Sequence, residues 1–482
     1  MVINLNFNIL FPEIFFILVS SIIFLVDKFI SNKNYAFYFT LIAIAFATFF
    51  LLFTPFGVFT KAYQSDFFSA TLKLLLLFGA FLVVLVSYSY LQTFNRMNYG
   101  EYYGLILFSL VGSFLMLSAM DLITIDLSME LMSFPVYFLI ALHFVEDRKS
   151  LEGALKYFLL GSLGSVFFLI GIGIIYYLTH TVDLILFSKL VHGVTQKKLL
   201  LLGFLFLLGG FSIKLALVPF HMWSPDAYES APLPITSFIA GLVKFVVMAT
   251  LVKVIILGFG ELKLSIADLL LPIALLSIFV GNVLAIKQDD IVRMLAYSSI
   301  AHAGYALLGL VAGDYIGYSF TIFYMFVYMI MTIGVFAVLV ALAQKDKKFL
   351  RIPELKGLSK SSGFLSFLLL VFMFSLAGIP PTGGFIAKLY LFLALIKTEH
   401  IVTAIIAILL SVIGAYPYLR VLKVVYMEPS QEKVEFSYGT TFLIPAIVTT
   451  ALILLIGIFP KPWTELVYKT VFFYVTMLFY VH

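Results

Sequence analysis

The chain has 482 residues, of which 63% are hydrophobic and only 11% are charged, whereas about a quarter of the residues of an ordinary soluble domain are charged. This composition excludes a soluble globular protein. The formal net charge is +5, but Lys and Arg occur singly or in short polar segments, so no nucleic-acid-binding surface is predicted. The sequence has no cysteine, which excludes disulfides, thiolate metal sites and iron–sulfur ligation by this chain.

A membrane-spanning helix needs about 20 mainly apolar residues. Fourteen segments meet this requirement, so we predict an all-α polytopic membrane protein of about 14 transmembrane helices in a single membrane domain, 1–482. The first segment, MVINLNFNILFPEIFF, lacks the basic region and cleavage site of a removable signal peptide and is predicted to be retained. The approximate centres of the spans are Leu18, Ala45, Gly79, Leu110, Met132, Phe168, Leu208, Val246, Phe279, Ala303, Met331, Leu376, Ala407 and Leu452.

The basic residues of the predicted loops divide unevenly between the two sides of the membrane. Sixteen fall on one side and eight on the other, and six of the sixteen lie between Lys345 and Lys360. Because basic loops are retained in the cytoplasm, both termini are predicted on the periplasmic side.

The fifth span carries Glu130 near its middle, in DLITIDLSMELMSFPVYFLIAL. A charged residue at the centre of a membrane helix costs about 2.5 to 3.5 kcal/mol on insertion scales, so Glu130 is a candidate functional residue. The alternative is a structural ion pair with one lysine. In the sixth span, Lys156 either reaches the headgroups or has a functional role. The glycines from Gly161 to Gly173 indicate close helix packing there and not phosphate binding.

The seventh span is interrupted in KLALVPFHMWSPDAYESAPLPITSF, which begins at Lys214. Proline removes a backbone donor, so this segment is predicted to be a broken or kinked helix. Non-helical backbone at membrane depth must be buried in protein or line a wet cavity, which leaves a packed kink or a transport site as alternatives. Lys214 is a candidate for the second. His221 could contact water at the break or only cap it.

Further lysines follow in the eighth span. Lys244 lies within ITSFIAGLVKFVVMATLVKVII, far from either end, and is a candidate functional residue. Lys253 and Lys397 lie near span ends, where snorkelling to the headgroups explains them better. Burial disfavours the charged form of a lysine and a nearby carboxylate favours it, so a buried set of Glu130 and lysines suits a proton relay.

His302 lies in the tenth span, within MLAYSSIAHAGY, and is either a relay residue or a helix-to-helix hydrogen bond. A second break, SLAGIPPTGGFIAKLYLF, follows from Ser375 and contains Lys388. Lys214 comes 84 residues after Glu130, and Lys388 comes 86 residues after His302. Paired broken helices in two halves point to the transport site of a repeat-built transporter.

Five strings resemble one family: DLSMELMSFPVYFL, ALKYFLLGSLGSVFFLIGIGIIY, KLALVPFHMWSPDAYESAPLPITSFIAGLVK, MLAYSSIAHAGY and LAGIPPTGGFIAKLYLF. They are similar to the antiporter-like subunit N family of bacterial proton-translocating NADH:quinone oxidoreductase, respiratory complex I, over nearly the whole chain. The sibling subunit M usually has a glutamate in place of Lys388, which favours N.

The resemblance implies two inverted five-helix repeats, each with a broken helix. The implied divisions are 1–100 for the first three helices, 101–260 and 265–428 for the repeats, and 438–482 for the last helix and an apolar tail. It implies that Glu130 and Lys214 interact, that Lys244 is a central relay lysine and that Lys388 belongs to the second broken helix. His302 and Lys156 also match family positions.

The resemblance further implies a subunit of the bacterial plasma membrane that translocates protons while quinone is reduced elsewhere. Its partners would be subunit M, small membrane subunits and the lipid bilayer. NADH, FMN, iron–sulfur clusters and quinone would be bound by partner subunits, with no cofactor or metal in this chain. Two alternatives remain, a subunit of a multi-subunit cation/proton antiporter and a structural membrane scaffold. The tail from Trp463 could span, lie in the interface or pack on a neighbour.

Overall fold

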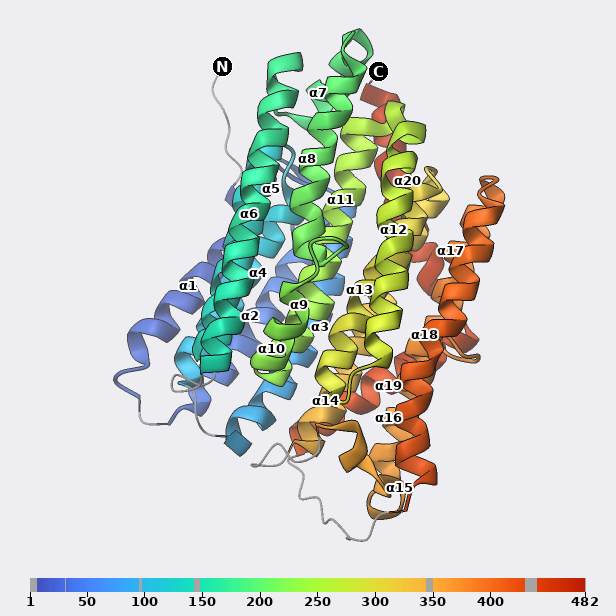
Figure 1. Ribbon diagram of the computed structural model, residues 1–482. Helices are drawn as coiled ribbons and strands as arrows, with labels where there is room; N and C mark the ends of the chain where they lie inside the picture. The colour runs from blue at the N-terminus through green and yellow to red at the C-terminus, as the bar shows by residue number, and fades with distance from the viewer. Residues whose placement is uncertain are drawn as a thin grey trace.

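The computed structural model describes residues 7–30, 32–94, 98–142, 148–343, 350–429 and 440–481. These residues form a bundle of long helices that run side by side (Figure 1). The basic residues Lys345, Lys347 and Lys348 lie outside the described residues. The first eleven α-helices are α1 (Phe11–Val26), α2 (Asn34–Phe53), α3 (Phe67–Phe94), α4 (Tyr99–Ser118), α5 (Leu122–Ala141), α6 (Arg148–Thr179), α7 (Leu184–Leu190), α8 (Lys197–Leu215), α9 (Trp223–Ser230), α10 (Leu233–Ser237) and α11 (Lys244–Phe259).

The second half continues as α12 (Lys263–Ile286), α13 (Ile291–Val311), α14 (Tyr315–Leu342), α15 (Leu358–Ser361), α16 (Gly363–Ala377), α17 (Gly383–Lys397), α18 (Ile401–Met427), α19 (Leu443–Ile458) and α20 (Lys461–Val481). A π-helical segment, η4 (Phe238–Val243), joins α10 to α11. The remaining helical pieces are 3-10 turns: η1 (Phe7–Leu10), η3 (Val191–Gly193), η5 (Gly260–Leu262), η6 (Ile352–Leu355) and η7 (Thr440–Phe442).

Within the described ranges, 12 helices are long and apolar enough to cross a membrane, or up to 13 if the bent pair α19 and α20 counts as one span. Each of the fourteen predicted centres lies in a separate helix. The segment around Leu376 is divided by the second break into α16 and α17, each of 15 residues, which is less than the about 20 residues that a span needs. The count of fourteen and the inverted repeats therefore stay predictions.

The structure departs from the purely helical prediction between α2 and α3. There β1 (Gly57–Thr60) and β2 (Tyr63–Ser65) form an antiparallel hairpin in which Gly57 faces Ser65. The Met120 amide donates to the carbonyl of Ala62 at 2.9 Å, so the hairpin is tied to the end of α4. Strands this short leave too little alternation in the sequence to be distinguished from a loop.

The centre of the bundle is the continuous element from α10 through η4 to α11. In the most apolar stretch of this element, 100% of the residues are buried inside the chain. The buried share is 94% in α13 and in α14, and it is only 33 to 39% in α1, α2, α6, α12 and α18. Glycine allows two helices to approach closely. Gly112 of α4 is an example, because the Cβ of any larger residue there would lie only 2.2 Å from the backbone nitrogen of Met132 in α5. Helices with exposed apolar faces therefore surround an inner group that is buried within the chain.

Both predicted helix breaks are present. α8 ends at Leu215, and Ala216 takes a left-handed conformation with φ of 57° before Pro219. α16 ends at Ala377, and Gly378, with φ of 84°, precedes Pro380 and Pro381. A left-handed residue after the last helical turn lets following amides reach the final carbonyls, and here the Leu217 amide donates to Ser212 O at 2.8 Å.

The apolar tail from Trp463 forms most of α20, which is bent by 86° from α19. Val467, Val471 and Tyr474 are buried, and α20 packs against α3 and α14 of the same chain. The tail therefore packs within the chain, and the choice between spanning, lying in the interface and packing on a neighbour stays open.

Candidate functional site

Glu130 and Lys214, from α5 and α8, form an ion pair with Lys214 Nζ 2.9 Å from Glu130 Oε1. The Lys214 side chain is fully buried, while that of Glu130 is 30% exposed. Ser165 of α6 donates to the same Glu130 oxygen at 2.8 Å. Lys214 also donates to the hydroxyls of Ser133 at 3.1 Å and Tyr137 at 3.0 Å. The ammonium is therefore held by one charge and two hydroxyls.

Lys244 is the first residue of α11 and follows the π-helical segment η4 directly. π-helical turns often mark functional sites because they change the register of the side chains that follow. The Lys244 ammonium is fully buried and donates to the Ser299 hydroxyl of α13 at 2.9 Å. The Tyr228 ring lies 5.9 Å from it.

His302 of α13 interacts electrostatically with both Lys244 and Lys388. Its Nδ1 is 2.7 Å from the Tyr324 hydroxyl, and its Nε2 is 3.3 Å from the Tyr418 hydroxyl. Because both ring nitrogens have hydroxyl partners, the imidazole can accept a proton on one side and donate from the other.

Lys388 of α17 reaches back across the second break. Its ammonium donates to the carbonyls of Leu376 at 3.1 Å and Ala377 at 3.0 Å, and to the Ser411 hydroxyl at 3.2 Å. The last carbonyls of a helix lack intrahelical partners and carry the negative end of the helix dipole. The break thus supplies the counter-charge that this buried lysine would otherwise lack.

Residues 119–414 match the family model described as NADH:quinone oxidoreductase/Mrp antiporter, TM. NADH-quinone oxidoreductase subunit N of Nitrosomonas europaea is 36% identical, with 95% of this chain and 96% of that protein aligned. The subunit N of Trichlorobacter lovleyi is 38% identical, with 95% of each chain aligned. The chain belongs to the NADH-quinone oxidoreductase subunit N family.

Two solved structures resemble this chain along nearly its whole length. A chain of respiratory complex I from Thermus thermophilus with bound aureothin has a TM-score of 0.79 and 30% identity, covering 94% of this chain and 98% of that chain. A chain of the Mrp complex from Dietzia sp. has a TM-score of 0.86 at 18% identity, covering 97% of each chain. The second likeness shows a shared fold alone.

Two of the predicted site residues of this subunit N family member, His221 and Lys156, are less buried than Lys214, Lys244, His302 and Lys388. His221 is half-buried in the first break, and its Nδ1 has no partner in the described part of the chain. Lys156 has a side chain 41% exposed and forms ion pairs of 2.6 Å with both Glu152 and Asp226. Its exposure fits the snorkelling expectation, but its ammonium binds carboxylates.

Asp226 connects Lys156 to Arg293, which donates to it at 2.8 Å and to Glu229 at 2.6 Å. Asp226, Glu229 and Arg293 line a cavity of about 550 Å³. Burial alone would raise the pKa of Asp226, but hydrogen bonds from Lys156 and Arg293 outweigh burial and lower that pKa below its ordinary value. The sequence interpretation did not single out Asp226.

The expectation that Lys253 snorkels is wrong. Its side chain is 1% exposed, and its ammonium donates to the carbonyls of Leu117, at 2.5 Å, and Ala119, at 2.8 Å. Lys253 lies near the end of α11, but α11 is enclosed by other helices, so the headgroups are out of reach. Lys397, by contrast, is exposed at the end of α17.

Asp126 is a second residue missed in the sequence. It is 5% exposed and interacts electrostatically with Glu130 and Lys214. Its Oδ1 is buried without a partner among the described residues. The four-residue spacing from Asp126 to Glu130 puts both on one helix face, and that spacing was the available signal. Among the described side chains, no group of three or more His, Cys, Asp and Glu is placed to hold a metal ion.

Proposed function

We propose that this chain translocates protons as the subunit N of an NADH:quinone oxidoreductase, driven by quinone reduction in other subunits. The observation that carries the proposal is the buried series Lys214, Lys244, His302 and Lys388, with Glu130 at its edge. Buried ionisable residues in a membrane protein are costly and mark proton pathways. Family membership supports the coupling, since the aligned relatives are named as subunits of that oxidoreductase.

The first step of the proposed mechanism is a change in the Glu130 to Lys214 pair. With the pair closed, Glu130 and the hydroxyls of Ser133 and Tyr137 stabilise the ammonium form of Lys214. Withdrawal of Glu130 removes the only one of these partners that carries charge. Burial then favours the neutral amine, and Lys214 releases a proton.

The later steps use Lys244, His302 and Lys388, whose hydrogen-bond partners given above are hydroxyls and backbone carbonyls and not carboxylates. The released proton passes to Lys244, then by way of His302 to Lys388. The hydroxyl partners of His302 give it one bonded neighbour on each ring nitrogen. The carbonyls at the end of α16 stabilise the charged form of Lys388 without an acid. NADH, FMN, iron–sulfur clusters and quinone belong to partner subunits in this proposal.

The test measures protons moved per NADH oxidised by the assembled complex in proteoliposomes. We expect Lys214→Met and Glu130→Gln each to lower that ratio, because each leaves the pair without one member. Lys397→Met is the matched control, since it removes an exposed lysine from the end of α17. If Lys214→Met and Glu130→Gln both move as many protons per NADH oxidised as Lys397→Met does, the proposed roles of Glu130 and Lys214 are wrong.

The same preparation separates the two alternatives. A subunit of a cation/proton antiporter would exchange sodium for protons without NADH oxidation. A structural scaffold would tolerate charge-neutralised variants with no change in proton flux. The subunits that co-purify with this chain add a direct check, because peripheral flavin and iron–sulfur subunits are expected only for the oxidoreductase.

A further inference from the structure

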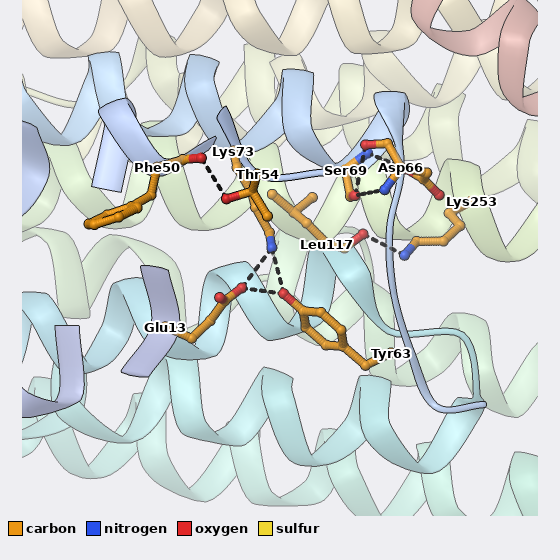
Figure 2. Close-up of polar contacts among 9 residues, drawn as sticks. All are labelled: Glu13, Phe50, Thr54, Tyr63, Asp66, Ser69, Lys73, Leu117 and Lys253. Atoms are coloured by element: carbon orange, nitrogen blue, oxygen red, sulfur yellow. Dashed lines mark hydrogen bonds and ion pairs between the residues drawn. The ribbon is translucent and has the colours of Figure 1, made fainter. Parts of the chain in front are cut away.

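A second group of buried charges lies away from the series described above, among α1, α3 and the β-hairpin. Lys73 Nζ is 2.6 Å from Glu13 Oε1 and donates to the Tyr63 hydroxyl at 2.8 Å. The Tyr63 hydroxyl in turn donates to the same oxygen of Glu13, so the three groups form a closed triangle (Figure 2). Glu13 is 2% exposed and Lys73 is 1% exposed.

Two more buried charges, Asp66 and Lys253, interact electrostatically with Lys73. Asp66, at the start of α3, interacts electrostatically with Lys73 and with Lys253 of α11, and it accepts a hydrogen bond from the Ser69 amide at 2.7 Å. From α4, the Phe114 ring lies 5.1 Å from Lys73 Nζ. We call Glu13, Tyr63, Asp66, Lys73 and Lys253 the Glu13 cluster. It holds two acids and two lysines, so its net charge is zero.

Structural need alone does not explain the Glu13 cluster. A buried ion pair is often no more stabilising than apolar side chains of the same size, because each charge loses its hydration on burial. Moreover, Glu13 Oε2 is buried and has no hydrogen-bond partner among the described residues. A carboxylate oxygen with an open acceptor position can take a proton.

The position of Lys253 relates the Glu13 cluster to the proposed relay. Lys244 and Lys253 are nine residues apart on α11, which is two and a half helical turns, so their side chains leave opposite faces of one helix. Lys244 faces Ser299 of α13, and Lys253 faces the end of α4. A displacement of α11 would therefore act on both groups of charges.

We propose that Glu13, Tyr63 and Lys73 form a second proton-exchange site, joined through Asp66 and Lys253 to the helix that carries Lys244. This inference rests on the proposed function. One proton binds Glu13 Oε2 and forms an O–H bond, and the neutral acid no longer holds Lys73. Lys73 then breaks one N–H bond and gives that proton, through intervening water, to the Asp66 carboxylate, with which it interacts electrostatically. Asp66 passes the proton on to water and is again a carboxylate, and the Glu13 proton moves to the Lys73 amine, which restores the ion pair.

The exchange is feasible because the buried charge stays balanced. Carboxylate with ammonium and carboxylic acid with amine both have zero net charge, so exchanging one state for the other buries no uncompensated ion. Burial raises the pKa of Asp66, although attraction to Lys253 and hydrogen bonds from Ser69 oppose the rise. Asp66 is thus able to hold a proton in passing.

Two variants of the assembled complex distinguish proton exchange by Glu13 and Lys73 from a purely structural ion pair. Lys73→Arg keeps the positive charge for Glu13, but a guanidinium does not give up its proton in proteins. The double variant Glu13→Gln with Lys73→Met removes both charges and keeps similar shapes. Each is reconstituted in proteoliposomes beside Lys214→Met, with the amount of assembled complex and the protons moved per NADH oxidised both measured.

We expect whichever variant assembles to lose as much pumping as Lys214→Met does. Normal pumping by an assembled Lys73→Arg or double variant would overturn the second site. If Lys214→Met also pumps normally, the proposed function fails instead, so the two failures are distinguishable. Infrared difference spectra supply an independent readout: the carbonyl band of a protonated carboxylic acid should be lost in Glu13→Gln, and its retention would overturn the role of Glu13.

Discussion

Replacing Gly161 with alanine would move one partner of Lys214 without changing any charge. Gly161 lies on α6, where an added Cβ would be 2.1 Å from the Tyr137 hydroxyl oxygen and 3.2 Å from Lys214 Nζ. Non-bonded heavy atoms pack at about 3.5 Å or more, so the hydroxyl must move by at least about 1 Å. The 3.0 Å hydrogen bond from Lys214 to Tyr137 would then be lost.

The size of the effect follows from the charge on the donor. A hydrogen bond to a charged group contributes about 1.5 to 3 kcal/mol, which changes the equilibrium of the Lys214 contact by about 10-fold to 150-fold. The helix itself gains from the substitution, because alanine is favoured over glycine in a helix interior by about 0.8 to 1.0 kcal/mol. Pumping should therefore fall while the amount of assembled complex does not.

Gly173→Ala is the matched control, because it lies on the same helix and an added Cβ there meets nothing within 4 Å. Both variants are compared for protons moved per NADH oxidised in proteoliposomes. We expect Gly161→Ala to fall below Gly173→Ala. Equal ratios would refute the reasoning that the position of the Tyr137 hydroxyl controls Lys214.

Three further predictions concern groups held by specific partners. Lys388→Met leaves the last carbonyls of α16 without their donor, at a cost of about 1 to 3 kcal/mol, so the Tm of the purified complex should fall; an unchanged Tm would contradict this capping role. Lys253→Met should reduce the amount of assembled complex in membranes, whereas Lys397→Met should not, and equal amounts would argue against the two carbonyl contacts of Lys253. Asp226 has a lowered pKa, so its stabilising effect is present above its unfolded pKa of about 4 and is lost as the pH falls through the folded value. Asp226→Asn should weaken the acid dependence of the Tm below about pH 4, and identical acid profiles would count against the pairing with Arg293.

The sequence indicated the residues of the buried series because they interrupt long apolar segments. Glu130, Lys214, Lys244 and Lys388 each lie well inside such a segment, where a charged side chain is costly. Both helix breaks were predictable for a related reason, since proline and glycine have strong local effects on the backbone. Local sequence, however, does not state which charges meet, and the Glu130 to Lys214 contact was expected only from the family resemblance.

The Glu13 cluster could not be predicted in the same way. Glu13 is in the first turn of α1, where an acid usually interacts with the helix dipole at the surface. Lys73 is near the start of α3, a position compatible with snorkelling. The hairpin and α4 are brought next to these residues by the fold, through Tyr63 and Phe114, and help to remove them from solvent. Lys253 was misjudged for the same reason, because its distance from the helix end does not reveal that α11 is enclosed.

Enclosure of α11 also separates it from the bilayer. Lipid thickness acts on hydrophobic helices through mismatch, which is relieved by tilting or by local deformation of the lipid. The peripheral helices α1, α2, α6, α12 and α18 would meet that stress first, since most of their apolar surface is open to the outside of the bundle. Lys244 and Lys253 belong to α11, which is enclosed by other helices of this bundle. A thinner or thicker membrane should therefore tilt the outer helices, while the two lysines keep their positions relative to each other.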